Sequence, residues 1–213
     1  MAPDRVRCRS DMSLLPFLDP PIADRRVALR DAAERDIPEI LIAHQDDPEL
    51  HGRLGLEQPP SGAELGRQTE EAPSEHRAGT RARLTILEHS SDQLRGQILV
   101  ENVDWENRRA ELAVWVVPQA RANGLARAAL RLAARWLFER CRFVRLELLA
   151  EPDNQPLLRA AAAAGFAREG LLRGHVRRGR TRQDMAILSL LASDLGPPGE
   201  GRARGSLQEE GRR

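Results

Sequence analysis

Apolar and polar residues alternate in several short stretches of the chain, and this period of two is typical of half-buried β-strands. Residues 26–30 read RVALR and form the first such stretch. Residues 83–89 and 94–103 predict two neighbouring strands with a short connection between them. Residues 111–117 predict a third long strand, which ends at Pro118 because proline has no N–H to donate to a sheet.

The C-terminal half of the chain predicts three more strands, at residues 144–150, 166–173 and 184–191. A basic segment, GHVRRGRTR, separates the last two strands, and we expect it to be a loop.

Between the strands, apolar residues recur at steps of three and four, which is the spacing of one helix face. A first helix follows Asp31 and ends near residues 46–48. Ser61 and Glu64 form a capping-box pattern that starts a second helix, and we expect residues 72–80 after it to be a loop.

Two further helices are predicted in the second half of the chain. The first starts within residues 121–126 and runs to about Arg140, with one apolar face made by Leu125, Ala129, Leu132 and Trp136. The second is an alanine-rich helix over residues 155–164, and Gly165 ends it because glycine readily adopts the conformation that closes a helix.

This order of elements, with an antiparallel meander in the middle, predicts an α+β domain. We expect a mixed, mostly antiparallel central sheet flanked by helices, not a doubly wound parallel sheet. The domain spans residues 25–194. Residues 1–24 are expected to form a flexible arm, and residues 195–213 a disordered tail because they are rich in Gly, Pro, Arg and Glu.

Composition narrows the function classes. The 213 residues carry a net charge of only +1, which gives no reason to expect nucleic acid or an anionic membrane as partner. Cys8 and Cys141 form no CxxC pair and have no histidine cluster near them, so we expect no metal site, no disulfide framework and a reduced, cytoplasmic setting. Lysine and tyrosine are absent, a bias typical of a GC-rich genome, and we expect a bacterial source.

The segment RANGLA, residues 121–126, joins a strand to a helix through a glycine. The first N–H groups of a helix lack internal partners and favour an anion, and the small Ala122, Gly124 and Ala126 would let a phosphate approach. Arg121 could add a charge-assisted bond. The segment is neither a P-loop nor a dinucleotide fingerprint, and an ordinary strand-to-helix turn is the alternative.

Arg121, Gly124 and Ala126 also fit a longer pattern: Arg or Gln, two residues, Gly, one residue, then Gly or Ala. This pattern resembles the acetyl-CoA loop of the GNAT superfamily of N-acetyltransferases. Residues 108–118 and 151–194 resemble its ribosomal-protein alanine N-acetyltransferase (RimJ/RimL-like) branch. The resemblance covers residues 25–194 and is strongest from Asn102 onward.

The resemblance implies a cofactor slot. The strand at residues 111–117 would splay from the strand at residues 144–150 in a V that accepts the pantetheine arm of acetyl-CoA. Backbone groups of Trp115, Val116 and Val117 would bond the pantetheine amides. Backbone N–H groups of the loop would hold the diphosphate, from Arg121, Ala122, Asn123, Gly124, Leu125 and Ala126.

The resemblance also implies two catalytic positions. Asn154, in the triplet PDN, would contact the cofactor near its thiol end. Glu111 would accept the proton of the amine, directly or through water, and burial on an apolar strand would raise its pKa and make it a better base. The alternative for Glu111 is a structural ion pair with Arg108 or Arg109.

Several positions depart from the family pattern. Ala122 and Asn123 stand where relatives often have Gly and Arg, so one cationic phosphate contact is lost and the turn has less conformational freedom. Leu157 replaces a serine expected to reach the cofactor. Tyrosine cannot be the general acid, and Cys141 is expected to be a buried apolar residue.

The sequence therefore predicts an acetyl-CoA-dependent N-acetyltransferase that acts by direct attack, without a metal. The acceptor would be a primary amine, on a protein N-terminus or a small molecule, and the chain a monomer or homodimer. His44 and His51 would line the acceptor pocket or be ordinary surface residues. The basic residues 177–182 are most simply solvated, or attract an acidic acceptor or the 3′-phosphate of CoA. A non-catalytic acyl-CoA-binding module and a ligand-free scaffold are the alternatives.

Overall fold

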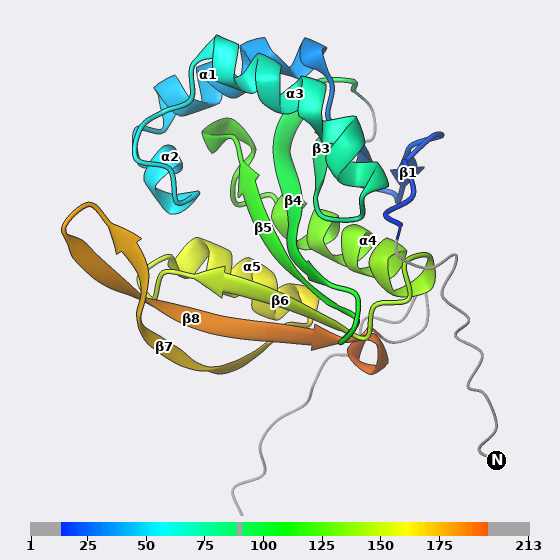
Figure 1. The fold of residues 1–213 in the computed structure, drawn as a ribbon, viewed down its shortest axis with the longest axis vertical. Coiled ribbons are helices and arrows are strands. Elements are labelled where there is room, and N and C mark those ends of the chain that lie inside the picture. Colours follow the sequence, from blue (N-terminus) through cyan, green and yellow to red (C-terminus); the bar gives the residue numbers. More distant parts are fainter. Residues whose placement is uncertain (1–13, 89–90, 196–213) are drawn as a thin grey trace, which may run out of the picture.

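The computed structural model describes residues 14–88 and 91–195. Its centre is one eight-stranded sheet with the strand order β1-β2-β3-β4-β5-β6-β8-β7 (Figure 1). The strands are β1 (Ile22–Ala23), β2 (Val27–Asp31), β3 (Ala82–Glu88), β4 (Leu94–Asp104), β5 (Arg109–Val116), β6 (Arg145–Ala150), β7 (Ala167–Arg178) and β8 (Thr181–Leu191). Every neighbouring pair is antiparallel except β5 and β6, which run parallel. The predicted α+β class, with a mixed and mostly antiparallel sheet, is confirmed.

Helices cover both faces of the sheet (Figure 1). They are α1 (Ile37–Asp46), α2 (Leu50–Arg53), α3 (Gly62–Arg77), α4 (Leu125–Glu139) and α5 (Gln155–Ala164). The side chains of β5 alternate between the two faces: Leu112 and Val114 join the core under α4, whereas Trp115 packs against residues of α1, α2 and α3.

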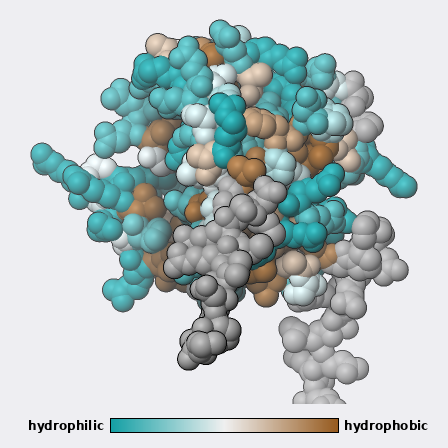
Figure 2. All heavy atoms as spheres, turned by 45° about the vertical axis from the view of Figure 1, so that its right-hand side comes forward, coloured by the Kyte–Doolittle hydropathy of each residue, from teal (hydrophilic) through white to brown (hydrophobic). Residues whose placement is uncertain are grey.

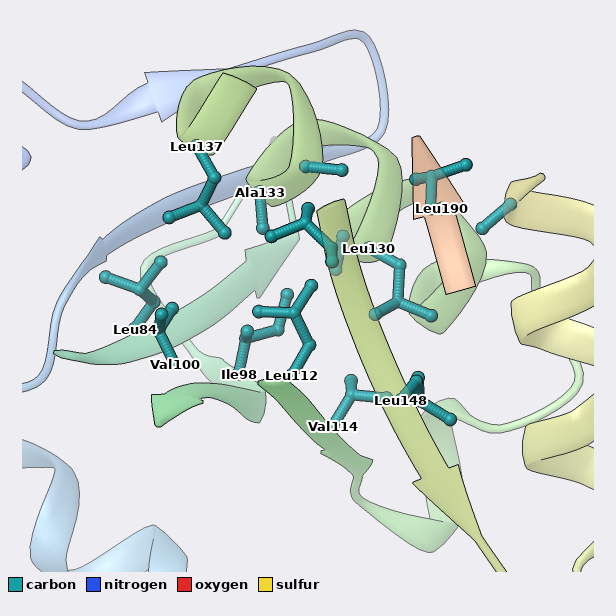
Figure 3. Packing of buried hydrophobic residues seen from close by; sticks show 14 of the residues in the cluster. Leu84, Ile98, Val100, Leu112, Val114, Leu130, Ala133, Leu137, Leu148 and Leu190 are labelled. Atoms are coloured by element: carbon teal, nitrogen blue, oxygen red, sulfur yellow. The ribbon is translucent and has the colours of Figure 1, made fainter. Parts of the chain in front are cut away.

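The larger core lies between the sheet and α4, where Leu130, Ala133 and Leu137 of the helix face the strands (Figure 3). The facing residues Leu84, Ile98, Val100, Leu112, Leu148 and Leu190 come from five different strands. Because all of them are essentially inaccessible to water, this layer fixes the relative positions of the strands that frame the site. The face of the molecule shown in Figure 2 is mostly hydrophilic, with apolar residues among the polar ones.

The N-terminal arm differs from expectation over its described part, residues 14–24. Leu15 and Leu18 are buried in the main core, and β1 pairs with β2. The backbone N–H of Leu18 donates to Asp31 (2.8 Å), and the ring of Phe17 lies 4.3 Å from that of His76. The apolar residues of this segment pack individually into the core, so residues 14–24 are not the flexible arm that the sequence predicts.

Two segments predicted to be loops are regular structure. Helix α3 continues through Pro73 to Arg77, where the loop over residues 72–80 was expected to begin. The basic segment after residue 173 extends the β7–β8 hairpin, which turns only at residues 179–180. Charged side chains on both sides of these strands hide the alternation, and pairing with the neighbouring strand holds them extended. The predicted tail over residues 195–213 lies outside the described residues apart from Leu195, which is buried.

Candidate active site

The parallel strands β5 and β6 pair over three positions only: Arg109 with Arg145, Ala110 with Leu146, and Glu111 with Glu147. Beyond Glu111, β5 continues along β4 and β6 continues along β8, so the two strands diverge (Figure 1). The predicted V is therefore present, and Glu111 is the last residue of β5 before it opens. The edge of β5 inside the V has no β6 partner for its backbone groups.

Gly96 on β4 shapes the end of β5, and sequence reasoning overlooked it. A Cβ at this position would lie 2.0 Å from the carbonyl oxygen of Trp115 and 2.9 Å from the Cα of Val116. Only glycine allows β4 to come this close to the end of β5. A glycine inside a strand pattern is a known sign of such an approach, so the sequence did contain a signal.

The orientation of the backbone decides which groups of the predicted pantetheine edge face the open V. The N–H of Val117 donates to Arg95 (2.9 Å) and its C=O accepts from Ala120 (3.0 Å), so Val117 is occupied within the chain. The carbonyl of Trp115 points to Gly96 on β4. Since backbone direction alternates along a strand, Val114 and Val116 face the open V. Among the residues that the structure describes, the N–H of Val116 is free there, whereas its carbonyl accepts from Nε of Arg121 (3.0 Å).

The loop over residues 121–126 passes through two left-handed residues before α4 begins. Gly124 has a φ of +74° and precedes α4, and Ala122 has a φ of +63°, which is the left-handed region that glycine adopts more easily. In the described part of the chain, the backbone N–H groups of residues 122–127 have no hydrogen-bond acceptor. These N–H groups lie at the positive end of the α4 dipole.

The side chain of Arg121 is held by other groups of the protein. Its Nε donates to the carbonyl of Val116 (3.0 Å) and its Nη2 forms an ion pair with Asp47. Burial acts to raise the pKa of Asp47, but the hydrogen bond and charge of Arg121 hold it below its ordinary value. Gln119 adds a second tie, donating to Asp46 (2.7 Å). The side chain of Arg121 thus anchors the loop to α1, and its contact with a phosphate stays a prediction.

Glu111 lies half-buried at the vertex of the V, opposite Glu101 of β4 and Glu147 of β6. Burial raises its pKa, and the two neighbouring carboxylates add to this effect. A hydrogen bond from Asn102 (Nδ2 to Oε2, 2.8 Å) and the charge of His175 act in the opposite direction. The carboxyl group is therefore a better proton acceptor near neutral pH than an ordinary glutamate.

The alternative of a structural ion pair for Glu111 is not what the structure contains. Arg109 pairs with Asp104 and Glu147, and Arg108 reaches the carbonyl of Arg142. The partner of Glu111 is Asn102, which was not among the predicted site residues.

Asn154 follows β6 and caps α5, because its Oδ1 accepts from the backbone N–H of Leu157 (3.3 Å). This capping bond is a structural role, and the amide nitrogen of Asn154 has no partner in the described part of the chain. Asn154 lies in the loop that follows β6, the second strand of the V, and its contact with the cofactor stays a prediction.

The remaining candidates differ in their surroundings. His44 is buried on α1, where burial first and the charge of His51 second lower its pKa, so it is neutral at physiological pH. Burial raises the pKa of Cys141 to about 12, which makes it an inert packing residue. Among the described residues no group of histidine, cysteine or carboxylate side chains is arranged to hold a metal, and no helix is long and apolar enough to cross a membrane.

A mixed sheet that splays between two parallel strands, next to a helix start with free N–H groups, is the arrangement that the family resemblance predicts. Residues 26–167 match the protein family described as "Acetyltransferase (GNAT) domain". The chain therefore belongs to this family.

Among curated proteins, the chain is 29% identical over 96 residues to YdaF of Bacillus subtilis (strain 168), which is provisionally named a ribosomal N-acetyltransferase. The match covers 45% of this chain and 52% of YdaF. The chain spans about half to two thirds of the length of the curated relatives it matches.

Two solved structures share the fold. RimJ of Mycobacterium smegmatis, in complex with CoA-disulfide, matches with a TM-score of 0.72 and 23% identity, covering 80% of this chain and 84% of that one. The spermidine N-acetyltransferase of Vibrio cholerae, in complex with CoA and spermine, matches with a TM-score of 0.69 and 19% identity, covering 81% and 99%.

Proposed function

We propose that the protein transfers the acetyl group of acetyl-CoA to a primary amine by direct attack, without an acyl-enzyme. The observation that carries this proposal is the position of Glu111 at the vertex of the V. A base with a raised pKa stands where the edge of β5 becomes free, and the N–H groups at the start of α4 lie beyond the other end of the same edge.

The residues present fit the cofactor. Free N–H groups over residues 122–127 supply donors for a diphosphate. Val114 and the N–H of Val116 lie along the edge that an extended pantetheine arm would follow, in the manner of an added strand. When bound, acetyl-CoA supplies the activated acetyl group.

Glu111 takes the proton that an ammonium must lose before it becomes a nucleophile. Asn102 orients this carboxylate through its amide. A backbone N–H of Val116 at the open edge is suited to polarise a carbonyl. The chain contains no tyrosine, so solvent or another group returns the proton to the leaving thiolate.

The acceptor is an amine on a protein N-terminus or a small molecule. Glu101, Glu111 and Glu147 stand in one row across three strands, and this row favours an acceptor that arrives positively charged. The names of the structural neighbours include both a ribosomal L7/L12 α-N-protein acetyltransferase and a spermidine N-acetyltransferase, which correspond to the two acceptor types.

The test has two stages. Calorimetry with acetyl-CoA measures binding, and thiol release in the presence of N-terminal peptides or polyamines measures turnover. Glu111→Gln should lower kcat by about 10²-fold or more while leaving the Kd for acetyl-CoA nearly unchanged, since general-base catalysis contributes on this order. Glu139→Gln, at the exposed end of α4, is the control. Equal rates for Glu111→Gln and wild type would remove Glu111 from the mechanism.

A non-catalytic acyl-CoA-binding module is the second candidate. Ala122 at a left-handed φ and Leu157 in place of a serine favour it, because both weaken the family site. Binding of acetyl-CoA without turnover on any amine would support the module, and failure to bind would exclude both functions.

A further inference from the structure

Within the turn itself, residues 121–126, the one cation is Arg121, and it is not free for a phosphate. Arg121 is engaged by Asp47 and by the carbonyl of Val116. Position 123, where relatives often have arginine, is a neutral asparagine. A diphosphate carries negative charge that backbone N–H groups neutralise only in part, so a positive side chain from elsewhere would strengthen the site.

Arg26, near the start of the domain in sequence, places its side chain against this loop. Its Nη1 donates to the carbonyl oxygen of Asn123 (3.1 Å), although 97 residues separate the two in sequence. The same nitrogen would lie 3.2 Å from a Cβ at Gly124, so the guanidinium sits directly against the glycine of the loop. Arg26 is exposed.

The surroundings of Arg26 hold the residue in position but leave its charge free. Asp24 accepts from the backbone N–H groups of Arg26 (2.7 Å) and Val27 (2.9 Å), which fixes the chain just before β2. Within residues 14–88 and 91–195, no carboxylate forms an ion pair with the Arg26 guanidinium, and its Nε and Nη2 have no acceptor. Only one nitrogen of the fork is thus used by the protein.

We propose that Arg26 replaces the missing loop arginine and binds the diphosphate of the cofactor through the free side of its guanidinium. This inference rests on the proposed use of acetyl-CoA. Holding the Asn123 carbonyl with Nη1 and the ligand with its other donors, Arg26 both positions the loop and neutralises the phosphate charge. Glycine at position 124 is then required for the guanidinium to approach, as well as for the turn.

Calorimetric titration of the full-length protein with CoA tests the proposal. Arg26→Gln should raise the Kd about 5- to 20-fold, the range of one solvent-exposed charge-assisted hydrogen bond. Arg26→Lys should recover part of the affinity because it keeps the charge. Arg25→Gln removes an adjacent exposed arginine and should leave the Kd unchanged. Circular dichroism of each variant establishes that the fold is retained.

Three further measurements separate ligand binding from a structural role. The Kd of wild type should rise with salt more steeply than that of Arg26→Gln, because screening acts on the removed charge. Arg26→Gln should weaken CoA and dephospho-CoA equally, since both contain the diphosphate. Asn123→Arg should restore affinity to Arg26→Gln by supplying the cation within the loop.

The outcomes that overturn the proposal are distinct. Unchanged CoA affinity in a folded Arg26→Gln protein would refute the role of Arg26 alone. A loss confined to CoA, and absent with dephospho-CoA, would refute the assignment to the diphosphate. If wild type itself binds no CoA, the proposed function fails together with this inference.

Discussion

Replacing Gly96 with alanine should distort the V, since this glycine is what lets β4 come so close to the end of β5. The added Cβ would lie 2.0 Å from the Trp115 carbonyl oxygen, whereas an ordinary contact needs more than 3 Å, so the backbone has to move by about 1 Å. Overpacking of this kind costs about 1–3 kcal/mol. The atoms that move belong to the backbone beside Val116, so the affinity for acetyl-CoA should fall as well.

Chemical denaturation measures the first effect, and calorimetry with acetyl-CoA measures the second. Gly170→Ala is the matched control, because Gly170 also lies in a strand but has open space around its Cβ position. We expect this control to change the free energy of unfolding by less than about 1 kcal/mol. A Gly96→Ala protein with wild-type stability and affinity would show that the end of β5 does not depend on the approach of β4.

Three other changes probe the loop and the base. Ala122→Gly should raise the free energy of unfolding by about 0.5–1 kcal/mol, measured by thermal or chemical denaturation. A left-handed alanine costs about 1–2 kcal/mol, and the greater chain entropy of glycine in the unfolded state offsets part of the gain. A destabilised variant would contradict the observed φ. Glu101→Gln should move the acidic limb of the pH–rate profile to lower pH, because Glu101 raises the pKa of Glu111 and only the deprotonated base is active. An unmoved limb would show that Glu111 is not the group that titrates. Asp47→Asn should lower the free energy of unfolding by about 1 kcal/mol near neutral pH, because the ion pair with Arg121 is lost. This difference from wild type should shrink as pH falls through the lowered pKa of Asp47, because wild type then loses the same charge. A difference that does not depend on pH would indicate lost packing instead.

Much of the sheet could be predicted because burial imposes a period of two. β5 is predicted by a different pattern, the continuous apolar run over residues 112–117, because both of its faces are covered. The β7–β8 hairpin beyond residue 173 could not be predicted in this way. Its side chains are polar or half-exposed on both faces, so pairing between the strands holds it, and pairing leaves no apolar pattern.

In the candidate site too, local features could be predicted from the sequence, whereas features that depend on distant parts of the chain could not. A strand, a glycine turn and an amphipathic helix are local features, so the positions of the loop and of Glu111 could be predicted from the chain and its family resemblance. The direction in which a backbone group points depends on the neighbouring strand, and this is why Val117 was assigned to the V while Val114 was overlooked. Arg26 could not be found from sequence at all, because its contact with Asn123 joins the first long strand to the middle of the chain.

Contacts between α1 and the cofactor loop link the acceptor side of the site to the cofactor side. Asp46 and Asp47 at the end of α1 hold Gln119 and Arg121, while Ile40 and Ala43 of the same helix share a core with Trp115. The end of β5 and the cofactor loop are therefore both braced by α1. A change on this helix, even one intended to alter the acceptor side through His44, will shift backbone groups that face the cofactor. Acceptor KM and acetyl-CoA Kd must be measured together before such a residue is assigned to either substrate.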